Sequence, residues 1–421
     1  MNSPTTKSNL VSSLAGFSET ELPQTLQDAI HVVSKLDIQY IWIDALCIVQ
    51  DDINDWEKEA IQMSSIFQNA YVTIAATAAQ SSSDGFLRRP NCCSLEMPFT
   101  VTKEGCVEQN GIFYARFPNR SNTSALISNS RWKRRGWTFQ EQILSTRVLY
   151  VTDDILYFEC LMAQKVEDNA YRIPSSLWIP WLQDARLIKK ERSKLTSKGD
   201  NPYLDWYSLV EEYTNRKLSC TADKLSALSG LAQKFAQVTD GVYLAGLWKS
   251  DLRRGIMWKP KFREHMTRPS TYRAPSWSWA ALDGAVEWGQ YFRYLDHDDT
   301  FEIRTAEITL SNVHTTGRVI GGRLVISGRL LPVIQIMQKP GKWNKGAYFD
   351  PNTFEKAECD LVSELSLERV IQALLLTKIF GLLLQPTDDC KNGKEEYRRV
   401  GWFNCSARVF SQVKSSIVTI I

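Results

Sequence analysis

Two carboxylates and one arginine in this sequence have the types and spacing to build an acid–base site. Asp44 follows the apolar segment Gln39–Ile43, Glu59 lies on the stretch after it, and Arg135 precedes a later aromatic block. Two carboxylates that face one cleft repel each other, so the pKa of one rises and suits it to transfer a proton. An arginine beside them would balance their charge or hold an anionic ligand. We therefore expect Asp44, Glu59 and Arg135 to share a site, with Glu141 at its margin.

A strand and a helix must position the two carboxylates. Gln39–Ile43 is short, apolar and rich in β-branched and aromatic residues, which predicts a strand buried on both faces with Trp42 in the core. Asp44 then ends this strand at the carboxyl edge of a sheet, where open α/β sheets bind their ligands. The segment Tyr71–Ala76 is predicted to form the next strand, so the predicted order of elements is strand, loop, helix and strand.

The helix of this unit is predicted to begin near Asp55. If Asn54 is its N-cap, Glu57 occupies the third helical position and closes a capping box, which is a structural role. Trp56 marks the centre of the buried face, and Glu59 lies about 60° from that centre, given roughly 3.6 residues per turn. Glu59 is therefore the better functional candidate. Its alternative role is that of an ion-paired glutamate at the edge of the core.

The other elements of the first region are short. Residues 1–20 are polar and are expected to be loosely held. Periodicity and turn residues then predict two helices, two strands and one hairpin. In chain order these are a helix from Pro23 to Leu36, strands near Met97–Val101 and Ile112–Phe117, a helix over Trp137–Leu144, and a hairpin of Arg147–Val151 and Ile155–Cys160.

The composition describes a soluble globular protein of two or three domains. A chain of 421 residues with 43% hydrophobic and 23% charged residues is long enough for an ample core. A net charge of +3 is near balance and gives no indication of a nucleic-acid partner. The nine cysteines are odd in number and include no CxxC pair, which favours a reduced, cytoplasmic compartment. The amino terminus has no apolar signal core, and Leu374–Leu384 is too short to span a bilayer, so no membrane is expected.

Several catalytic signatures are absent from the sequence. It contains no GxxxxGK[ST] loop, no GxGxxG, no HExxH and no GxSxG. Nucleotide hydrolysis of the P-loop type, Rossmann redox chemistry and zinc peptidase chemistry therefore lack support, and we assign no metal ligands. Cys47 lies near the end of the predicted strand, but a free cysteine is more often a buried apolar residue than a nucleophile.

The remainder of the chain changes in composition along its length. We divide the protein into an α/β domain over residues 1–160, a charged linker over 161–202, a helical region over 203–300 and a β-rich region over 301–421. In the helical region Trp277 and Trp279 alternate with serines, which predicts a strand with both indoles on one core face. One helix or two are predicted over Glu364–Leu384 in the β-rich region. The expected fold class is α/β at the front and α+β overall.

Four ordered blocks of the chain resemble the fungal heterokaryon incompatibility (HET) domain. The first runs from Leu22 to Ala70 and includes Tyr40–Gln50 and Asp55–Glu59. The later blocks are Arg135–Glu141, Ala245–Trp248 and Pro275–Ala280. The family usually opens with a strand that carries a Ser-Tyr-x-Trp-Gly-like motif, and no such motif is recognisable before Leu22.

The resemblance implies a cytosolic fungal protein whose HET domain acts in non-self recognition and triggers regulated cell death. HET domains are also distantly similar to Toll/interleukin-receptor domains, some of which cleave NAD with a catalytic glutamate. Carried over to this sequence, the catalytic role falls on Glu59, with Asp44 lining the pocket and NAD as the substrate. The residues expected to bind the substrate are Arg135, Glu141, Gln50 and Trp56.

A second interpretation is a stand-alone enzyme that acts on a small metabolite in secondary-metabolite biosynthesis. It is favoured because no sensor module accompanies the HET-like blocks and because the family's first strand is not recognisable. A non-catalytic interaction scaffold is a third interpretation. The expected ligand is a small molecule or a nucleotide, no cofactor is assigned, and a homo-oligomer is compatible with the sequence.

Overall fold

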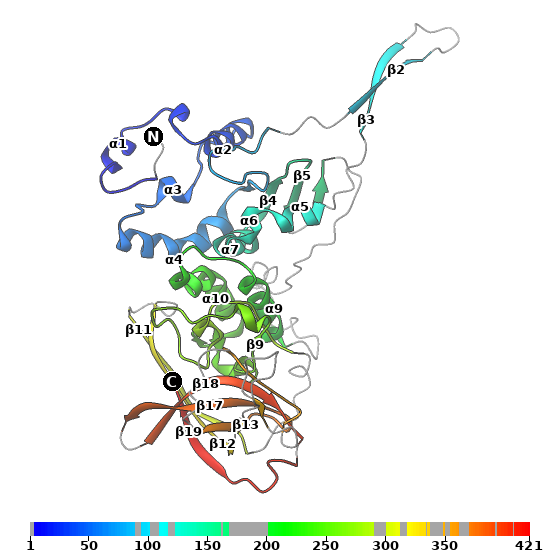
Figure 1. The fold of residues 1–421 in the computed structure, drawn as a ribbon. Coiled ribbons are helices and arrows are strands. Elements are labelled where there is room, and N and C mark those ends of the chain that lie inside the picture. The colour runs from blue at the N-terminus through cyan, green and yellow to red at the C-terminus, as the bar shows by residue number, and fades with distance from the viewer. Residues whose placement is uncertain are drawn as a thin grey trace. The chain divides into compact units, whose positions relative to one another are not determined.

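A computed structural model of the chain describes residues 4–88, 94–101, 109–116, 123–160, 163–167, 201–289, 300–311, 318–333, 335–336, 348–349, 354–361, 370–391, 394–406 and 408–421. The chain divides into two compact units, Met1–Trp178 and Ile179–Ile421 (Figure 1). Both units combine helices with strands, which agrees with the mixed fold class expected from the sequence.

The first unit is built on a four-stranded sheet in the order β1-β4-β5-β6. The strands are β1 (Thr73–Ala75), β4 (Arg147–Val151), β5 (Leu156–Cys160) and β6 (Gln164–Val166); β1 and β4 are parallel and the other pairs antiparallel. The predicted hairpin of β4 and β5 is thereby confirmed. Because Tyr150 pairs with both Ala75 and Tyr157, these side chains share one face of the sheet, which carries the core of this unit. The core residues are Ala75, Ile127, Trp132, Val148, Tyr150, Tyr157 and Val166.

Short helices and one separate hairpin complete the first unit. The helices are α1 (Leu10–Leu14), α2 (Gln24–Lys35), α3 (Asp44–Cys47), α4 (Ile53–Asn69), α5 (Thr123–Asn129), α6 (Arg131–Arg134) and α7 (Trp137–Leu144), with a 3₁₀ turn at Glu19–Glu21. The separate hairpin pairs β2 (Ser94–Val101) with β3 (Gln109–Arg116). The helix predicted over Trp137–Leu144 is confirmed as α7, which packs against α4 (Figure 1).

The strand predicted over Gln39–Ile43 is wrong. These residues belong to no sheet, and Tyr40 is 86% exposed. Ile43 keeps extended dihedral angles (φ −132°, ψ 122°), but a helix begins at the next residue. A strand needs a hydrogen-bonding partner as well as suitable residues, and β1, the next strand along the chain, pairs with β4 instead. Trp42 is therefore half-buried, with its ring edge-on to that of Phe67 at 5.6 Å, and does not occupy the middle of a buried strand.

The predicted start of the next helix is also wrong. α4 begins at Ile53, and its N-cap is Asp52, whose Oδ1 accepts a hydrogen bond from the backbone N–H of Asn54 at 3.1 Å. Asn54 and Glu57 therefore do not form the expected capping box. Asp52 is the stronger cap because it is ionised and because its carboxylate is also oriented by an ion pair of 3.3 Å with Lys7.

The second unit begins with a helical part. Its helices are α9 (Pro202–Thr214), α10 (Ser226–Thr239) and α11 (Leu252–Gly255), with 3₁₀ turns at Thr221–Lys224, Lys249–Asp251, Arg263–His265 and Trp279–Ala281. Two short antiparallel pairs accompany them: β7 (Tyr243–Leu244) with β8 (Leu247–Trp248), and β9 (Lys259–Pro260) with β10 (Val286–Glu287).

The strand predicted around Trp277 and Trp279 is wrong, although both indoles are fully buried as predicted. Trp277 lies in a turn, and Trp279 opens the 3₁₀ turn with Ser278 as its N-cap. The Ser278 hydroxyl accepts from the backbone N–H of Ala280 at 3.0 Å and donates to the carbonyl of Ala245 at 2.5 Å. Serine favours such local bonds over a strand ladder, which explains the difference.

Trp206, Ala245, Gly246, Ser278 and Trp279 form a buried group that we call the indole cluster. The indole N–H groups of Trp206 and Trp279 both donate to the carbonyl of Gly246, each at 3.0 Å. Ala245 and Gly246 have positive φ angles of 49° and 97° in the turn between β7 and β8. A Cβ atom at Gly246 would lie 2.6 Å from Nε1 of Trp279, so this position requires glycine for its conformation and for space.

The rest of the second unit is a seven-stranded sheet that closes on itself. The strand order is β11-β12-β16-β17-β18-β15, and β19 pairs with both β12 and β18, so β12, β16, β17, β18 and β19 form a ring. The pairs of the ring are antiparallel except β18 with β19. Phe403, Phe410, Ile371 and Leu383 belong to its core cluster. The bounds are β11 Glu302–Leu310, β12 Val319–Val333, β13 Gln335–Ile336, β14 Tyr348–Phe349, β15 Lys356–Cys359, β16 Ile371–Leu375, β17 Phe380–Lys391, β18 Lys394–Asn404 and β19 Ser415–Ile420.

The helix predicted over Glu364–Leu384 is wrong wherever the structure describes this range, which is from residue 370 onward. The segment forms β16 and the start of β17, which pair antiparallel across a turn at Thr377. Leu374 and Leu382 are both completely buried, and so are several of their neighbours in the chain. A continuous apolar run of this kind does not distinguish a strand covered on both faces from a buried helix.

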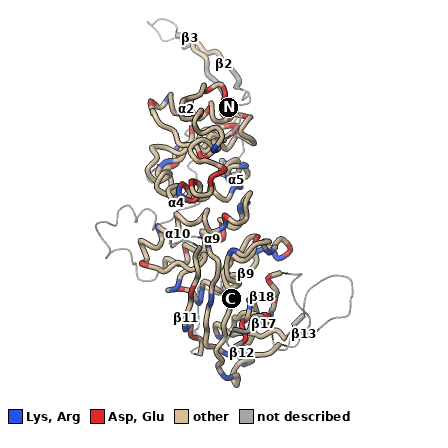
Figure 2. The backbone as a smooth tube through the Cα atoms, turned by 90° about the vertical axis from the view of Figure 1, so that its left-hand side faces the viewer, with Lys and Arg blue, Asp and Glu red and all other residues tan. Residues whose placement is uncertain are grey.

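Lysine and arginine are interspersed with aspartate and glutamate along the described residues of both units (Figure 2). No helix in the described part of the chain is long and apolar enough to cross a membrane. Of the predicted charged linker, residues 163–167 contain β6, and residues 161–162 and 168–200 lie outside the described ranges.

Candidate functional site

Asp44 opens α3 and is exposed, because the expected strand before it does not form. Its Oδ1 accepts from the backbone N–H of Ala45 at 2.8 Å. Its carbonyl oxygen accepts from the side-chain amide of Gln50 at 3.0 Å, and the same amide group lies 3.2 Å from the carbonyl oxygen of Ile48. Gln50 therefore folds its side chain back over its own loop and holds α3 in place.

The segment Thr5–Lys7 lies across this loop and is not loosely held as the sequence suggested. Thr5 is buried, and its backbone N–H donates to Ala45 O at 2.9 Å while its hydroxyl donates to Leu46 O at 2.8 Å. The backbone N–H of Gln50 donates to Thr5 O at 2.8 Å. These hydrogen bonds fix both ends of the loop that follows Asp44.

Asp55 connects this loop to α4. Its Oδ2 accepts from the backbone N–H of Val49 at 2.8 Å, and Asp55 lies in the first turn of the helix that carries Glu59. A carboxylate in the first turn is also favoured by the helix dipole. The positions of Asp44 on α3 and Glu59 on α4 are thus fixed relative to each other by short polar contacts.

Glu59 is the less accessible of the two candidate carboxylates. Its side chain is 16% exposed, and its ion pair with the 67% exposed side chain of Lys58 is long, at 3.9 Å. Both carboxylates influence the thiol of Cys47. Burial of the thiol raises the Cys47 pKa, and the negative charges of Glu59 and Asp44 also raise it. The thiol therefore stays protonated at neutral pH, which disfavours a nucleophilic role for Cys47. That Asp44 and Glu59 share one site stays a prediction.

Trp56 joins the first motif block to the Arg135–Glu141 block. Its ring meets that of Trp137 edge-on, with 5.9 Å between ring centroids, where α4 packs on α7. Trp56 and Trp137 are both half-buried. The two blocks are far apart in the sequence, so their contact makes them parts of one local structure.

Arg135 and Glu141 lie on the segment of α6 and α7. Arg135 is exposed at the end of α6, and no ion pair joins it to Asp44 or Glu59 in the described part of the chain. Its carbonyl oxygen accepts from the hydroxyl of Thr138 at 2.8 Å. Glu141 is half-buried on α7, and its carbonyl oxygen accepts from Ser145 at 2.6 Å.

Sequence reasoning missed Asp28 on α2. Its Oδ2 accepts from the backbone N–H groups of Phe86 at 2.6 Å and Leu87 at 3.0 Å, and its Oδ1 accepts from Gln24 Nε2 at 2.8 Å. Burial raises the Asp28 pKa, but these hydrogen bonds outweigh it, so the net shift is downward. Gly85 packs against this carboxylate with φ of 72°. The helical pattern gave no signal for it, because Asp28 lies on the side of the predicted helix opposite to Leu26 and Ile30.

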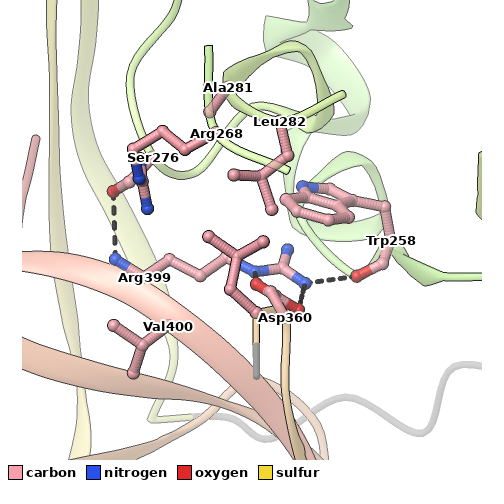
Figure 3. A pocket seen from close by; sticks show the side chains of 9 residues that line it. Trp258, Arg268, Ser276, Ala281, Leu282, Asp360, Arg399 and Val400 are labelled. Carbon is pink, nitrogen blue, oxygen red and sulfur yellow. Dashed lines mark hydrogen bonds and ion pairs between the residues drawn. The ribbon is translucent and has the colours of Figure 1, made fainter. Parts of the chain in front are cut away.

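A small cavity in the second unit surrounds a buried ion pair (Figure 3). Arg399 on β18 contacts Asp360 through Nε at 2.8 Å and donates to the carbonyl oxygens of Ile256 at 2.7 Å and Trp258 at 2.5 Å. Its guanidinium group also lies 3.5 Å from the ring centroid of Trp258. The lining residues are Trp258, Arg268, Ser276, Ala281, Leu282, Asp360, Leu361, Arg399 and Val400.

This cavity measures about 10 Å³, which is room for about one water molecule. Burial raises the Asp360 pKa and lowers the Arg399 pKa, while the charge and hydrogen bonds of each partner oppose the shift of the other. The pair connects β18 to the loop at residues 256–258, and its donors are already used. We therefore assign it a structural role. No group of three or more His, Cys, Asp or Glu side chains among the described residues could hold a metal ion.

Comparison with known proteins identifies the first unit. Residues 2–141 match the sequence model of the family described as heterokaryon incompatibility protein (HET). Comparisons with curated proteins and with solved structures find no match. The matched range contains Asp28, Asp44, Glu59 and Trp137 with all of their contacts described above. Residues 2–141 of the chain are therefore a heterokaryon incompatibility (HET) domain.

Proposed function

We propose that this protein acts in non-self recognition and regulated cell death, and that its HET domain does so by cleaving NAD. One observation carries the catalytic part of the proposal. Glu59 lies inside the matched range, its side chain is 16% exposed, and the ammonium group of Lys58 is 3.9 Å from its carboxylate. A carboxylate that is desolvated but weakly neutralised is suited to stabilise a positive charge that develops in a transition state.

The proposed reaction breaks the bond between the nicotinamide nitrogen and C1′ of the adjoining ribose. Nicotinamide leaves as a neutral molecule with the bonding electron pair, and the ribose acquires positive charge. Water attacks C1′ and loses one proton, which gives ADP-ribose. Glu59 would stabilise the charged ribose and then accept the proton of the attacking water, as carboxylates do in glycoside hydrolysis.

The neighbouring residues fit supporting roles in this reaction. Trp56 and Trp137 offer half-buried aromatic rings on which a nicotinamide or adenine ring could stack. Arg135 is exposed and suited to bind the pyrophosphate. Asp44 would line the pocket next to Glu59, and Gln50 would act by holding the Asp44 loop. Glu141 remains a candidate at the margin of the site.

The test is nicotinamide release by the purified full-length chain supplied with NAD, measured by chromatography. We expect Glu59→Gln to lower the rate about 100-fold or more, because it removes the negative charge while nearly keeping the shape. Glu57→Gln is the matched control: it lies two residues away on the same helix and should keep a rate within about threefold of the wild type.

Two outcomes would contradict the proposal. If the wild-type chain releases no nicotinamide, NAD is not the substrate, and the metabolite-transforming alternative becomes the next hypothesis to test. If NAD is cleaved but Glu59→Gln and Glu57→Gln behave alike, the reaction takes place at another site. Growth arrest on expression in a fungal host, lost with Glu59→Gln and kept with Glu57→Gln, would connect the activity to cell death.

A further inference from the structure

Helix α3, which begins at Asp44, is too short to pair its own backbone groups. It has four residues, and the last four carbonyl oxygens of any α-helix have no partner within the helix. A single helical turn is also unfavourable by itself, because its formation fixes several residues for one hydrogen bond. The position of α3, and of the Asp44 side chain that it carries, therefore depends on groups outside the helix.

Thr5 supplies these outside groups. Its backbone N–H donates to the carbonyl of Ala45 at 2.9 Å, and its hydroxyl donates to the carbonyl of Leu46 at 2.8 Å. Its own carbonyl oxygen accepts at 2.8 Å from the backbone N–H of Gln50, which would bond to Leu46 if the helix continued. Thr5 thus takes the place of the next turn of α3. It is 6% exposed, so water competes little for these hydrogen bonds.

Lys7 binds the start of α4, the helix that carries Glu59. The backbone N–H of Lys7 donates to Asp51 Oδ1 at 2.8 Å. Its ammonium group lies 3.3 Å from Oδ2 of Asp52, the N-cap of α4. The segment Thr5–Lys7, which we call the anchor segment, therefore binds α3 with its first residue and α4 with its last.

The anchor segment has a fixed shape of its own. The side-chain oxygen of Asn9 accepts from the backbone N–H of Thr6 at 2.7 Å, and the side-chain amide of Asn9 donates to the carbonyl of Pro4 at 3.1 Å. Asn9 therefore holds the chain on both sides of Thr5. Because the segment is held in shape between its two contacts, α3 cannot move relative to the start of α4 without the loss of hydrogen bonds at one of them.

We propose that Thr5 is a positioning residue of the candidate site: it fixes α3 and thereby holds the Asp44 carboxylate in place relative to Glu59. The proposal rests on the proposed function for its catalytic consequence alone, since the contacts that carry it involve no substrate. The alternative is that Thr5 contributes only to stability. Thr146 provides the comparison, because its hydroxyl donates to the carbonyl of Gln68 at 2.8 Å near the other end of α4.

The thiol of Cys47, the last residue of α3, gives a test without substrate. Burial raises the Cys47 pKa, and the charges of Glu59 and Asp44 also raise it, so release of α3 should let this pKa fall toward its ordinary value. The full-length chain is labelled with iodoacetamide between about pH 7.5 and about pH 10, and the labelled Cys47 peptide is quantified by mass spectrometry.

Thr5→Val removes the hydroxyl but keeps the branched shape and every backbone hydrogen bond of Thr5, so the protein should fold. We expect its Cys47 labelling profile to move to lower pH by about 0.5 unit or more. Thr5→Ser keeps the hydroxyl and should keep the wild-type profile. Thr146→Val removes a hydrogen bond of the same kind from the same unit and should also keep the wild-type profile.

Nicotinamide release from NAD then tests the catalytic consequence. We expect Thr5→Val to lower kcat about tenfold and to change KM by less than about threefold, because displacement of a catalytic group costs rate more than binding. Thr5→Ser and Thr146→Val should both keep kcat within about twofold of the wild type. Rescue by serine separates the role of the hydroxyl from that of the apolar part of the side chain.

Three outcomes would overturn the proposal. They are an unchanged Cys47 labelling profile in Thr5→Val, an equal movement of the profile in Thr146→Val, and a wild-type kcat in Thr5→Val when NAD is cleaved. If the profile moves as expected but the wild-type chain releases no nicotinamide, Thr5 fixes α3 as proposed and NAD is not the substrate. That failure belongs to the proposed function and is therefore distinguishable from a failure of the positioning role.

Discussion

The tryptophans of the indole cluster in the second unit are buried completely, whereas those nearest the candidate site in the first unit are half-buried. Trp206 and Trp279 both place their N–H groups on the carbonyl of Gly246. Trp42 and Trp56 make single edge-on contacts with other rings. Aromatic motif residues thus have two different uses here. Those of the second unit specify the fold, and those of the first leave aromatic surface accessible.

The same contrast holds for ion pairs. Arg399 and Asp360 in the second unit have side chains 0% and 4% exposed, with several hydrogen bonds that satisfy the buried charges. Glu59 in the first unit has one exposed lysine at 3.9 Å. A buried and fully paired charge is costly to separate and is therefore fixed in place, whereas a weakly paired carboxylate remains able to act on a ligand.

Substitution of a tryptophan by alanine should have the largest effect and should differ between the units. We expect Trp279→Ala to lower the free energy of unfolding of the second unit by about 3–5 kcal/mol, because it removes a completely buried ring and leaves a cavity. Trp42→Ala should lower the free energy of unfolding of the first unit by only about 1–2 kcal/mol, because its ring is partly exposed to water in the folded state. Urea denaturation followed by circular dichroism, with a transition fitted for each unit, measures both values. Equal losses would remove the distinction drawn between the two units.

Local patterns in the sequence predicted part of the fold well. Helix α7 and the hairpin of β4 and β5 have strong periodicity and clear turns between them, and both are confirmed. The failures share one cause. Gln39–Ile43, Trp277–Trp279 and Glu364–Leu384 are apolar segments whose structure depends on partners distant in the sequence, and periodicity alone contains no information about those partners.

The candidate site was predictable to a similar extent. Spacing on one helix identified Glu59 as a residue at the edge of the buried face, and its side chain is mostly covered. The hydrogen bonds from Thr5 to the Asp44 loop and from Phe86 to Asp28 were not predictable, since they join residues about 40–60 positions apart through backbone atoms that have no residue-specific signal.

Two glycines with positive φ provide a second comparison of the units. Gly246 has φ of 97° and its Cβ position is blocked by Trp279, whereas Gly16 has φ of 105° and no atom within 4 Å of its Cβ position. Gly246→Ala therefore combines backbone strain with a steric clash against Trp279, and it should lower the free energy of unfolding by about 3 kcal/mol. Gly16→Ala adds backbone strain alone and should lower the free energy of unfolding by about 1 kcal/mol. Thermal unfolding of the two variants gives the difference. A Gly246→Ala protein as stable as Gly16→Ala would show that the indole cluster can rearrange.

Lys224 supplies an effect of another kind, a change in how stability depends on pH. It is 5% exposed, its Nζ donates to the carbonyl of Leu282 at 2.5 Å, and it lies 5.4 Å from the ring centroid of Trp279. Burial, and to a lesser extent the charge of Arg273, lower the pKa of Lys224 to about 7, and the charge of Asp283 opposes this shift. An unfolded chain restores the ordinary lysine value near 10.4, so between about pH 7 and about pH 10 the unfolded state binds more protons than the folded state.

The free energy of unfolding should therefore rise with pH between about pH 7 and about pH 10, and Lys224 contributes up to about 1.4 kcal/mol per pH unit. Below about pH 7 Lys224 is protonated in both states and contributes no slope. Lys224→Met should remove this part of the slope. Lys58→Met in the first unit, where the side chain is 67% exposed, should leave it unchanged. Urea denaturation of the three proteins at about pH 7, 8 and 9 measures the slopes. An unchanged dependence of the unfolding free energy on pH in Lys224→Met would contradict this prediction. Lys224 would then be charged in the folded state as readily as in water. The ring of Trp279 and the carbonyl of Leu282 would have to offset the whole cost of burying the charge.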